Sequence, residues 1–195
     1  MRLTSDMLVT TTYLEQTAPT DLRPAKPPTE PGLLVRIDEV SPEFCRFLYA
    51  SVGGDWYWLG RLSWTFAQWT EWLARPGSET WVLWSHGTPV GYIELDSQPG
   101  PTTTQVEIAY FGLLPRFIGR GLGGQLLTEG VTHAWSMRDR WPELPPVDRV
   151  WVHTCTLDGE HALANYTARG LRPYLTSEHD EPLPPVAPGP WPGAR

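Results

Sequence analysis

The pattern of apolar and polar residues divides the chain into strands and helices. Apolar residues alternate with polar ones over residues 33–40, which predicts a strand, and two helical patterns follow over 41–53 and 65–73. Three strands joined by short turns, a long helix, a strand, a short helix and a last strand are expected over residues 79–85, 90–96, 106–114, 125–137, 147–157, 160–169 and 171–176. This order predicts an α/β (α+β) fold with an antiparallel meander at its centre.

Proline marks the two ends of the predicted domain. Residues 8–14 are β-prone, and a proline-rich segment separates them from residue 32. We therefore expect residues 1–31 to form an N-terminal strand and a linker, and residues 32–178 to form the domain. From residue 181 onward six prolines follow closely, which predicts an unpacked proline-rich tail within residues 179–195.

Composition and charge narrow the functional class. The chain has 195 residues, with 22 acidic and 15 basic side chains and a net charge of −7, so nucleic acid is not an expected partner. An acidic surface instead favours the approach of a cationic substrate. No apolar run is long enough to cross a membrane, and the N-terminus lacks a signal peptide. Cys45 and Cys155 form no disulfide framework, so a reduced, cytoplasmic protein is expected.

The clearest chemical signal is a glycine-rich stretch between a predicted strand and the long predicted helix. It reads I-G-R-G-L-G-G over residues 118–124. Glycine lets the backbone approach a ligand closely, because there is no Cβ in the way. The first turn of a helix also leaves N–H groups free at the positive end of the helix dipole. The stretch therefore predicts a site for phosphate or pyrophosphate, although a glycine-rich loop can also serve close packing alone.

A dinucleotide-binding loop is the first interpretation of this stretch to consider. Gly119, Gly121 and Gly124 satisfy the G-x-G-x-x-G fingerprint. That fingerprint belongs to a parallel βαβ unit, usually with an acidic residue about 20 positions later. Here the preceding strand is the third of a meander, and no acidic residue ends the next strand at that distance. The sequence therefore argues against dinucleotide binding.

The longer segment over residues 113–123, L-L-P-R-F-I-G-R-G-L-G, resembles the acyl-CoA signature of the Gcn5-related N-acetyltransferases (GNAT). That signature runs V-x-P-x-x-[RQ]-x-x-G-x-[GA] and opens a helix. Ile118 stands where the family usually has Arg or Gln, and this position contributes mainly a backbone N–H. The order of elements over residues 33–176 also resembles the family's topology.

The resemblance implies a GNAT fold: a central, mixed, mostly antiparallel sheet with helices on both faces and its fourth and fifth strands splayed apart. Pantetheine lies in that gap in the family. The implied co-substrate is acetyl-CoA, with no metal. The residues implied to bind it are Leu113, Ile118, Gly119, Arg120, Gly121, Leu122, Gly123 and Gly124.

Two residues are candidates for proton transfer, because an amine must lose a proton before it can attack a thioester and the leaving thiolate needs one. Glu107 resembles by position the glutamate that one branch of the family uses as general base, and Glu94 is the reserve candidate. Tyr166 opens Y-T-A-R-G-L, which resembles the family's Y-x-x-x-G-[FL], where the tyrosine often protonates the thiolate. The usual asparagine seven residues earlier is Gly159 here. A solvated or ion-paired Glu107 and a packing Tyr166 are the alternatives.

Aromatic residues crowd the segment around the first two helices, where the family places its acceptor site. Trp56 and Trp58 fall in a loop and are candidates for substrate contact, whereas Trp69 and Trp72 have the spacing of core residues. We expect His153 to be a hydrogen-bonded core residue and His133 to be a surface or packing residue. No His, Cys and carboxylate cluster has the spacing of metal ligands.

Taken with the resemblance, these residues predict an N-acetyltransferase in which an amine attacks acetyl-CoA directly in a ternary complex. The alternatives are another acyl-CoA or a hydroxyl acceptor, and a non-catalytic acyl-CoA-binding module. The acceptor is expected to be a small-molecule or peptide amine. The protein is expected to be a monomer or a homodimer.

Overall fold

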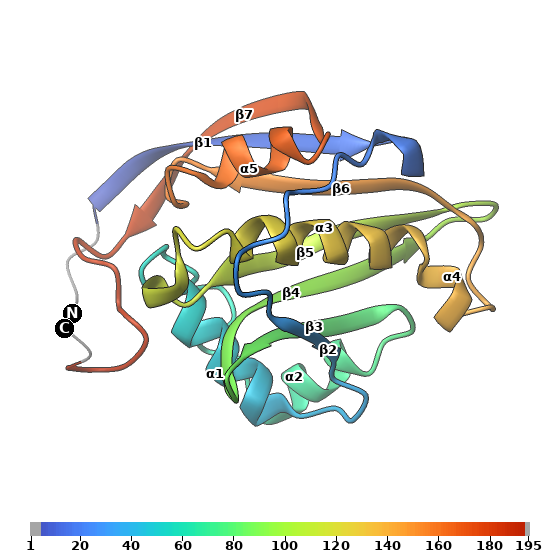
Figure 1. The fold of residues 1–195 in the computed structure, drawn as a ribbon. Coiled ribbons are helices and arrows are strands. Elements are labelled where there is room, and N and C mark those ends of the chain that lie inside the picture. The colour runs from blue at the N-terminus through green and yellow to red at the C-terminus, as the bar shows by residue number, and fades with distance from the viewer. Residues whose placement is uncertain (1–4, 194–195) are drawn as a thin grey trace.

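The computed structural model describes residues 5–193, which contain a seven-stranded sheet in the order β2-β3-β4-β5-β6-β1-β7. Figure 1 shows α3 and α5 on one face of this sheet and α1 and α2 on the other. The strands are β1 (Ser5–Gln16), β2 (Leu33–Arg36), β3 (Ser78–Ser85), β4 (Thr88–Pro99), β5 (Thr104–Leu113), β6 (Val147–Cys155) and β7 (Arg172–Leu183). The helices are α1 (Pro42–Gly53), α2 (Phe66–Leu73), α3 (Leu122–Trp135), α4 (Met137–Arg140) and α5 (Ala162–Ala168), with 3-10 turns at Pro19–Asp21 and Pro115–Phe117.

The first two helices begin at the caps that the sequence provides. The Ser41 hydroxyl accepts a hydrogen bond from the Phe44 N–H, with Pro42 in the first helical turn. At α2, Thr65 and Gln68 form a reciprocal capping box. Both predicted helices are therefore present within one residue of their expected bounds.

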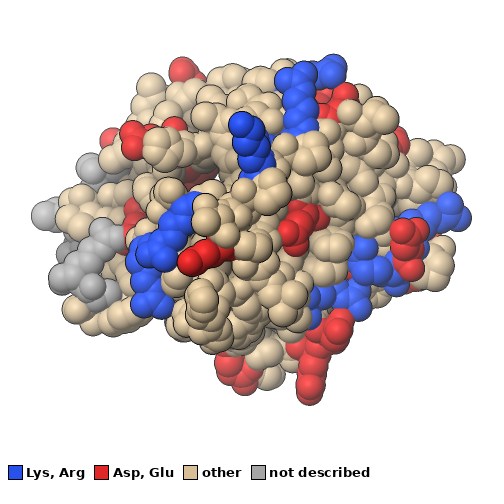
Figure 2. All heavy atoms as spheres, in the orientation of Figure 1, with Lys and Arg blue, Asp and Glu red and all other residues tan. Residues whose placement is uncertain are grey.

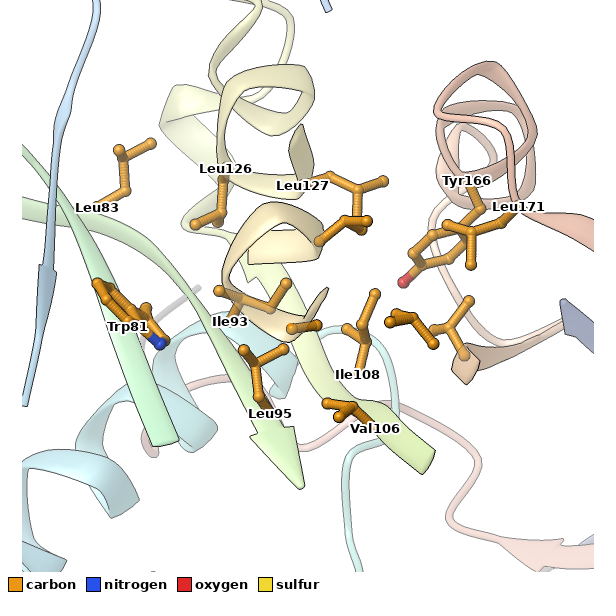
Figure 3. Packing of buried hydrophobic residues seen from close by; sticks show 14 of the residues in the cluster. Trp81, Leu83, Ile93, Leu95, Val106, Ile108, Leu126, Leu127, Tyr166 and Leu171 are labelled. Atoms are coloured by element: carbon orange, nitrogen blue, oxygen red, sulfur yellow. The ribbon is translucent and has the colours of Figure 1, made fainter. Parts of the chain in front are cut away.

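The main core lies between α3 and the sheet. Leu126 and Leu127 of α3 are fully buried against Ile93 of β4 and Ile108 of β5, as Figure 3 shows. Removing this much apolar surface from water is the principal force that holds α3 on the sheet. It therefore fixes the position of the glycine-rich segment that immediately precedes α3.

The parallel pair β5 and β6 stays together along only part of its length. Pairing runs from Thr104 opposite Val147 to Glu107 opposite Trp151 and then stops. Just beyond that point β5 has a bulge, where Tyr110 pairs with Glu94 and Ile108 with Leu95. A bulge bends its strand and ends regular pairing. The expected mixed, mostly antiparallel sheet with a splayed parallel pair is confirmed.

The N-terminal strand lies inside the sheet, which sequence analysis did not anticipate. Residues Thr11–Gln16 pair with β6, and residues Ser5–Glu15 pair with β7, both antiparallel. Leu14 is fully buried in the main core. The segment expected to stand apart from the domain at 1–31 therefore completes its sheet, because β6 and β7 have no direct pairing in the strand order.

The C-terminal segment also packs further along than its proline content suggested. β7 continues to Leu183, which pairs with Ser5 and is 1% exposed. Further on, the Gly189 N–H donates a hydrogen bond to the Gly54 carbonyl at 2.9 Å. The expectation of an unpacked tail is therefore wrong for these residues, because backbone pairing with β1 and a buried leucine outweigh the local effect of proline.

A buried carboxylate joins β3 to the C-terminal end of α4. Glu79 is 2% exposed and accepts hydrogen bonds from both Arg140 Nε (2.7 Å) and an Arg140 terminal nitrogen (2.8 Å). The indole N–H groups of Trp81 and Trp141 bond the same carboxylate, each at 2.9 Å. Burial acts to raise the pKa of Glu79, but these donors outweigh it, and the net pKa lies below the ordinary value.

We expect Glu79→Gln to lower the free energy of unfolding by about 3 kcal/mol at pH 7, because a partly buried Arg140 loses its ion-pair partner. A carboxylate whose pKa is lowered by folding stabilises the native state above its unfolded pKa. That stabilisation is lost as the pH falls through the lowered folded value. The difference between wild type and variant should therefore shrink below about pH 4 in urea unfolding experiments. Asp38→Asn is the control, because Asp38 is an exposed partner of Arg36. This substitution should lower the free energy of unfolding by less than about 1 kcal/mol. An equal loss in both variants would contradict a special role for Glu79.

Candidate active site

A cavity of about 850 Å³ lies where β5 and β6 separate. Residues 108–113 of β5 and Val152, His153 and Cys155 of β6 line its middle. One end reaches the glycine-rich segment and Tyr166 on the face that carries α3 and α5, and the other reaches Tyr49 and Trp58 on the face that carries α1. The cavity therefore passes through the sheet.

The glycine-rich segment forms a turn that only glycine adopts readily. Gly119 has φ +84° and Gly121 has φ +80°, both in the left-handed region. Gly121 is the N-cap residue of α3 and provides no side-chain cap. The N–H groups of the first helical turn are thus left for a ligand, at the positive end of the helix dipole.

The residues predicted to bind the cofactor do not all line the same cavity. Leu113, Ile118, Gly119, Gly121, Gly123 and Gly124 line the cavity. The side chain of Arg120 instead lines a separate hollow of about 360 Å³, and Leu122, whose edge also reaches that hollow, is buried in the core. For these two residues, only backbone groups remain as candidates for contact with a ligand in the main cavity.

The surroundings of this turn fit a diphosphate. A Cβ on Gly124 would lie 2.9 Å from the Ala25 Cβ and 3.0 Å from a terminal nitrogen of Arg169, so the site requires glycine and has a guanidinium beside it. Arg169 Nε is buried and has no hydrogen-bond partner among residues 5–193. Asn165, which also lines the cavity, donates to the Gly123 carbonyl at 3.4 Å. Positive charge and free N–H groups therefore meet at one end of the cavity.

His153 and Glu107 form a pair beside the cavity. His153 Nδ1 lies 3.3 Å from Glu107 Oε1, and the other Glu107 oxygen accepts a hydrogen bond from Gln98 Nε2 at 2.9 Å. The His153 side chain is 47% exposed and lines the cavity, whereas Glu107 is 15% exposed and is not among the lining residues. The predicted base, Glu107, therefore does not line the cavity itself but contacts His153, which does.

The expectation that His153 is a core residue is wrong. Strand alternation directs Val152 and Thr154 into the core, so His153 takes the opposite face. At that position β6 has already separated from β5, which leaves the imidazole open to the cavity. His133 is a packing residue as expected, since its ring stacks on Trp81 with centroids 3.7 Å apart.

The reserve candidate, Glu94, is occupied by other groups. It is 1% exposed, and one Arg61 nitrogen donates to both of its oxygens at 2.8 and 3.0 Å. The Trp72 indole N–H adds a third hydrogen bond at 2.7 Å. Glu94 does not line the cavity and serves to hold Arg61 in place.

Tyr166 projects from α5 toward Ile108 of β5, with its hydroxyl leading (Figure 3). It is 5% exposed, lines the cavity and packs against Phe111 with ring centroids 5.8 Å apart. Burial raises the pKa of this phenol strongly, and the negative charge of Asp158 adds to the rise. The hydroxyl therefore stays protonated and can donate a hydrogen bond over the whole physiological pH range.

Aromatic rings close the end of the cavity beside α1, and we call Tyr49, Trp56, Tyr57, Trp58 and Tyr110 the aromatic wall. Sequence analysis predicted Trp56 and Trp58 as contacts, and both line the cavity. Tyr49 and Tyr110 were missed because their spacing is that of core residues, and neither carries a local signal of its own. The missed Asn165 had one available signal, its place directly before Tyr166.

Other classes of site find little support in residues 5–193. These residues contain no group of three or more His, Cys, Asp or Glu side chains placed to hold a metal ion. Within the same range, no helix has the length and apolarity needed to cross a membrane. Figure 2 shows acidic and basic side chains interspersed over the face that carries α3.

Comparison with known proteins gives consistent results. The family model described as "Acetyltransferase (GNAT) family" matches residues 41–170. No curated protein matches the chain.

Several solved structures share the fold. One, from Novosphingobium aromaticivorans and titled a putative acetyltransferase of the GNAT family, is 16% identical with a TM-score of 0.54, over 90% of this chain and 65% of that one. A GCN5-related N-acetyltransferase from Sphaerobacter thermophilus is 18% identical with a TM-score of 0.56, over 94% and 54%. An aminoglycoside acetyltransferase from an uncultured soil metagenomic sample is 17% identical with a TM-score of 0.58, over 78% and 98%. The chain thus spans less than two thirds of the first two structures.

Proposed function

The chain belongs to the acetyltransferase (GNAT) family, and on that premise we propose that it moves an acetyl group from acetyl-CoA to an amine by direct attack in a ternary complex. The co-substrate would supply an activated acetyl thioester. The chain's own residues would bind its diphosphate, hold its thioester in the gap between β5 and β6, take up the amine's proton and stabilise the departing sulfur.

The observation that carries this proposal is the passage of one cavity through the sheet. Its phosphate-binding end lies at Gly119 and Gly121, and its aromatic end lies on the opposite face. A long, thin ligand bound by its diphosphate would have to reach through the gap to meet an acceptor. His153 and Tyr166 both line the cavity, so proton-handling groups stand along that path.

Four groups divide the chemical work in this proposal. His153 takes the proton of the amine, and Glu107 orients the imidazole through its contact with Nδ1. Ala109, the extra residue of the β5 bulge, lines the cavity, and its backbone N–H is a candidate donor to the thioester carbonyl. The Tyr166 hydroxyl stabilises the departing sulfur by hydrogen bonding, since its raised pKa disfavours full ionisation.

The acceptor is a small-molecule or peptide amine in this proposal. Similar structures titled as aminoglycoside acetyltransferases support a small-molecule acceptor, although their identity to this chain is only 13–17%. A hydroxyl acceptor would also need a base, and His153 could take the proton of a hydroxyl as well as that of an amine.

The test combines binding and turnover. Purified protein is expected to bind coenzyme A in calorimetric titration and to release free thiol from acetyl-CoA when amines are added. Mass spectrometry should find the amine heavier by one acetyl group. Binding without thiol release across amines and alcohols would favour a non-catalytic acyl-CoA-binding module. Release with propionyl-CoA or longer donors in preference to acetyl-CoA would assign a different acyl group.

A further inference from the structure

The aromatic wall is a preformed surface. The rings of Tyr49, Trp58 and Tyr110 contact one another, with centroid distances of 5.6 Å for Tyr49–Trp58, 4.9 Å for Trp58–Tyr110 and 5.0 Å for Tyr49–Tyr110. Edge contacts of this kind hold each ring in one orientation. The wall therefore presents fixed ring faces and edges to the cavity.

A buried ion pair supports the wall from behind. The guanidinium of Arg61 lies 4.4 Å from the centroid of the Tyr110 ring, and the Arg61 backbone N–H donates a hydrogen bond to the Tyr49 hydroxyl at 3.2 Å. Glu94 balances the Arg61 charge. The cation is thus neutralised within the protein and adds no positive charge to the cavity.

Two residues of the loop between α1 and α2, Trp56 and Tyr57, extend the wall. Tyr57 has φ +57°, a conformation that costs about 1 kcal/mol or more for a residue other than glycine. The Trp56 indole lies against Gly159 in the turn after β6, 3.5 Å from where a Cβ would stand. The loop between α1 and α2 therefore contributes two further rings to the end of the cavity where the amine is proposed to bind.

The charges around this end favour a cation. Asp158, Glu160 and Glu181 line the cavity outside the wall, while no Lys or Arg side chain among residues 5–193 lines it. The wall itself carries no carboxylate, and its polar atoms are the hydroxyls of Tyr49, Tyr57 and Tyr110 and the indole N–H groups of Trp56 and Trp58. The lining of the cavity is thus acidic outside the wall, whereas the wall itself is flat and mainly apolar.

From this asymmetry we propose that the acceptor is an arylalkyl primary amine, with its ring against Trp56 and Trp58 and its amino group near His153. This proposal rests on the proposed acetyltransferase function. The amine nitrogen forms a bond to the acetyl carbon while the carbon–sulfur bond breaks. The amine's proton goes to His153, and the sulfur leaves as a thiolate that is protonated from solvent, so the products are an N-acetyl arylalkylamine and coenzyme A thiol. A polyhydroxylated aminoglycoside would leave many hydroxyls without partners against such a wall.

The first test compares four acceptors, of which the phenyl and cyclohexyl compounds are similar in shape but differ in aromaticity. Thiol release is measured with 2-phenylethylamine, 2-cyclohexylethylamine, spermidine and the aminoglycoside sisomicin. Aromatic stacking should give 2-phenylethylamine a kcat/KM about 2- to 10-fold above that of the cyclohexyl compound. Spermidine and sisomicin should be poorer than 2-phenylethylamine by about 100-fold or more. Spermidine or sisomicin as the best acceptor would overturn this proposal and leave the acetyltransferase function standing.

The second test removes one ring. Trp56→Leu should raise KM for 2-phenylethylamine about tenfold while kcat and the KM for acetyl-CoA change little, because a wall contact binds substrate and transition state alike. Trp56→Phe should restore most of the loss. Tyr174→Leu is the control, since Tyr174 is an exposed aromatic residue of β7 outside the cavity, and it should leave all three constants unchanged. An unchanged KM in a folded Trp56→Leu protein would place the acceptor elsewhere. No thiol release with any amine would instead refute the acetyltransferase function itself.

Discussion

Gly121→Asp is expected to weaken coenzyme A binding by about 10³-fold, which would abolish it in an ordinary calorimetric titration. The new carboxylate would stand at the N-terminus of α3, where the diphosphate is proposed to bind. Two unit charges about 4 Å apart repel by about 4 kcal/mol near a protein surface, which corresponds to that factor. The same side chain would also compete for the free N–H groups of the first helical turn.

Two variants separate charge from backbone strain in this experiment. Gly121 has φ +80°, so any other residue there is strained, and Gly121→Ala measures that strain together with the approach of a Cβ to Pro28 at 3.2 Å. Gly87 has φ +76° in open space at the β3–β4 turn and does not line the main cavity, so Gly87→Asp adds the same residue under similar strain outside the proposed diphosphate site. We expect Gly87→Asp to bind normally and Gly121→Ala to bind weakly. Normal binding by a folded Gly121→Asp protein would show that the diphosphate lies elsewhere.

The glycine-rich turn could be predicted from sequence because its requirements are local. A positive φ at Gly119 and Gly121 selects glycine at those two positions, and the following apolar period identifies the helix. The caps at Ser41 and Thr65 are local in the same sense. For these elements, the residues that determine the local structure lie within a few positions of it along the chain.

The position of β1 could not be predicted in this way. Its β-prone residues indicated a strand, but the pairing partners Val152 and Leu175 lie more than a hundred residues away. Nothing local distinguishes a strand that completes a sheet from one that stands outside it. The proline count at the C-terminus failed for a related reason, since backbone pairing of Leu183 with Ser5 depends on where β1 lies.

The candidate residues for proton transfer show where sequence reasoning stopped. Glu107 was found through its place before the glycine-rich segment, but the group that reaches the cavity is its neighbour His153. Whether a side chain on β6 is buried depends on where that strand separates from β5, and that point follows from the bulge at Ala109. A bulge leaves no reliable trace in a single sequence, so His153 was assigned to the core only because it lies on a strand expected to be buried.

The largest effect on turnover is expected from the pair formed by His153 and Glu107. If the imidazole takes the amine's proton, His153→Asn should lower kcat by about 10²–10⁴-fold, because asparagine keeps a hydrogen bond but accepts no proton. The acidic limb of the pH–rate profile should disappear in this variant. His86→Asn is the matched control, since His86 is exposed at the β3–β4 turn and asparagine tolerates its φ of +48°. Coenzyme A binding should be unchanged in both.

Glu107→Gln then decides how the two residues share the work. If Glu107 only orients the imidazole, Glu107→Gln should lower kcat less than His153→Asn does. The double variant should be no slower than His153→Asn alone, because residues that act as one unit are not additive. The opposite result, a full loss in Glu107→Gln with little effect in His153→Asn, would make Glu107 the base and require a water molecule between its carboxylate and the amine. Poorly basic amines, already neutral at pH 7, should be the least affected in either case, because they have no proton to lose before attack.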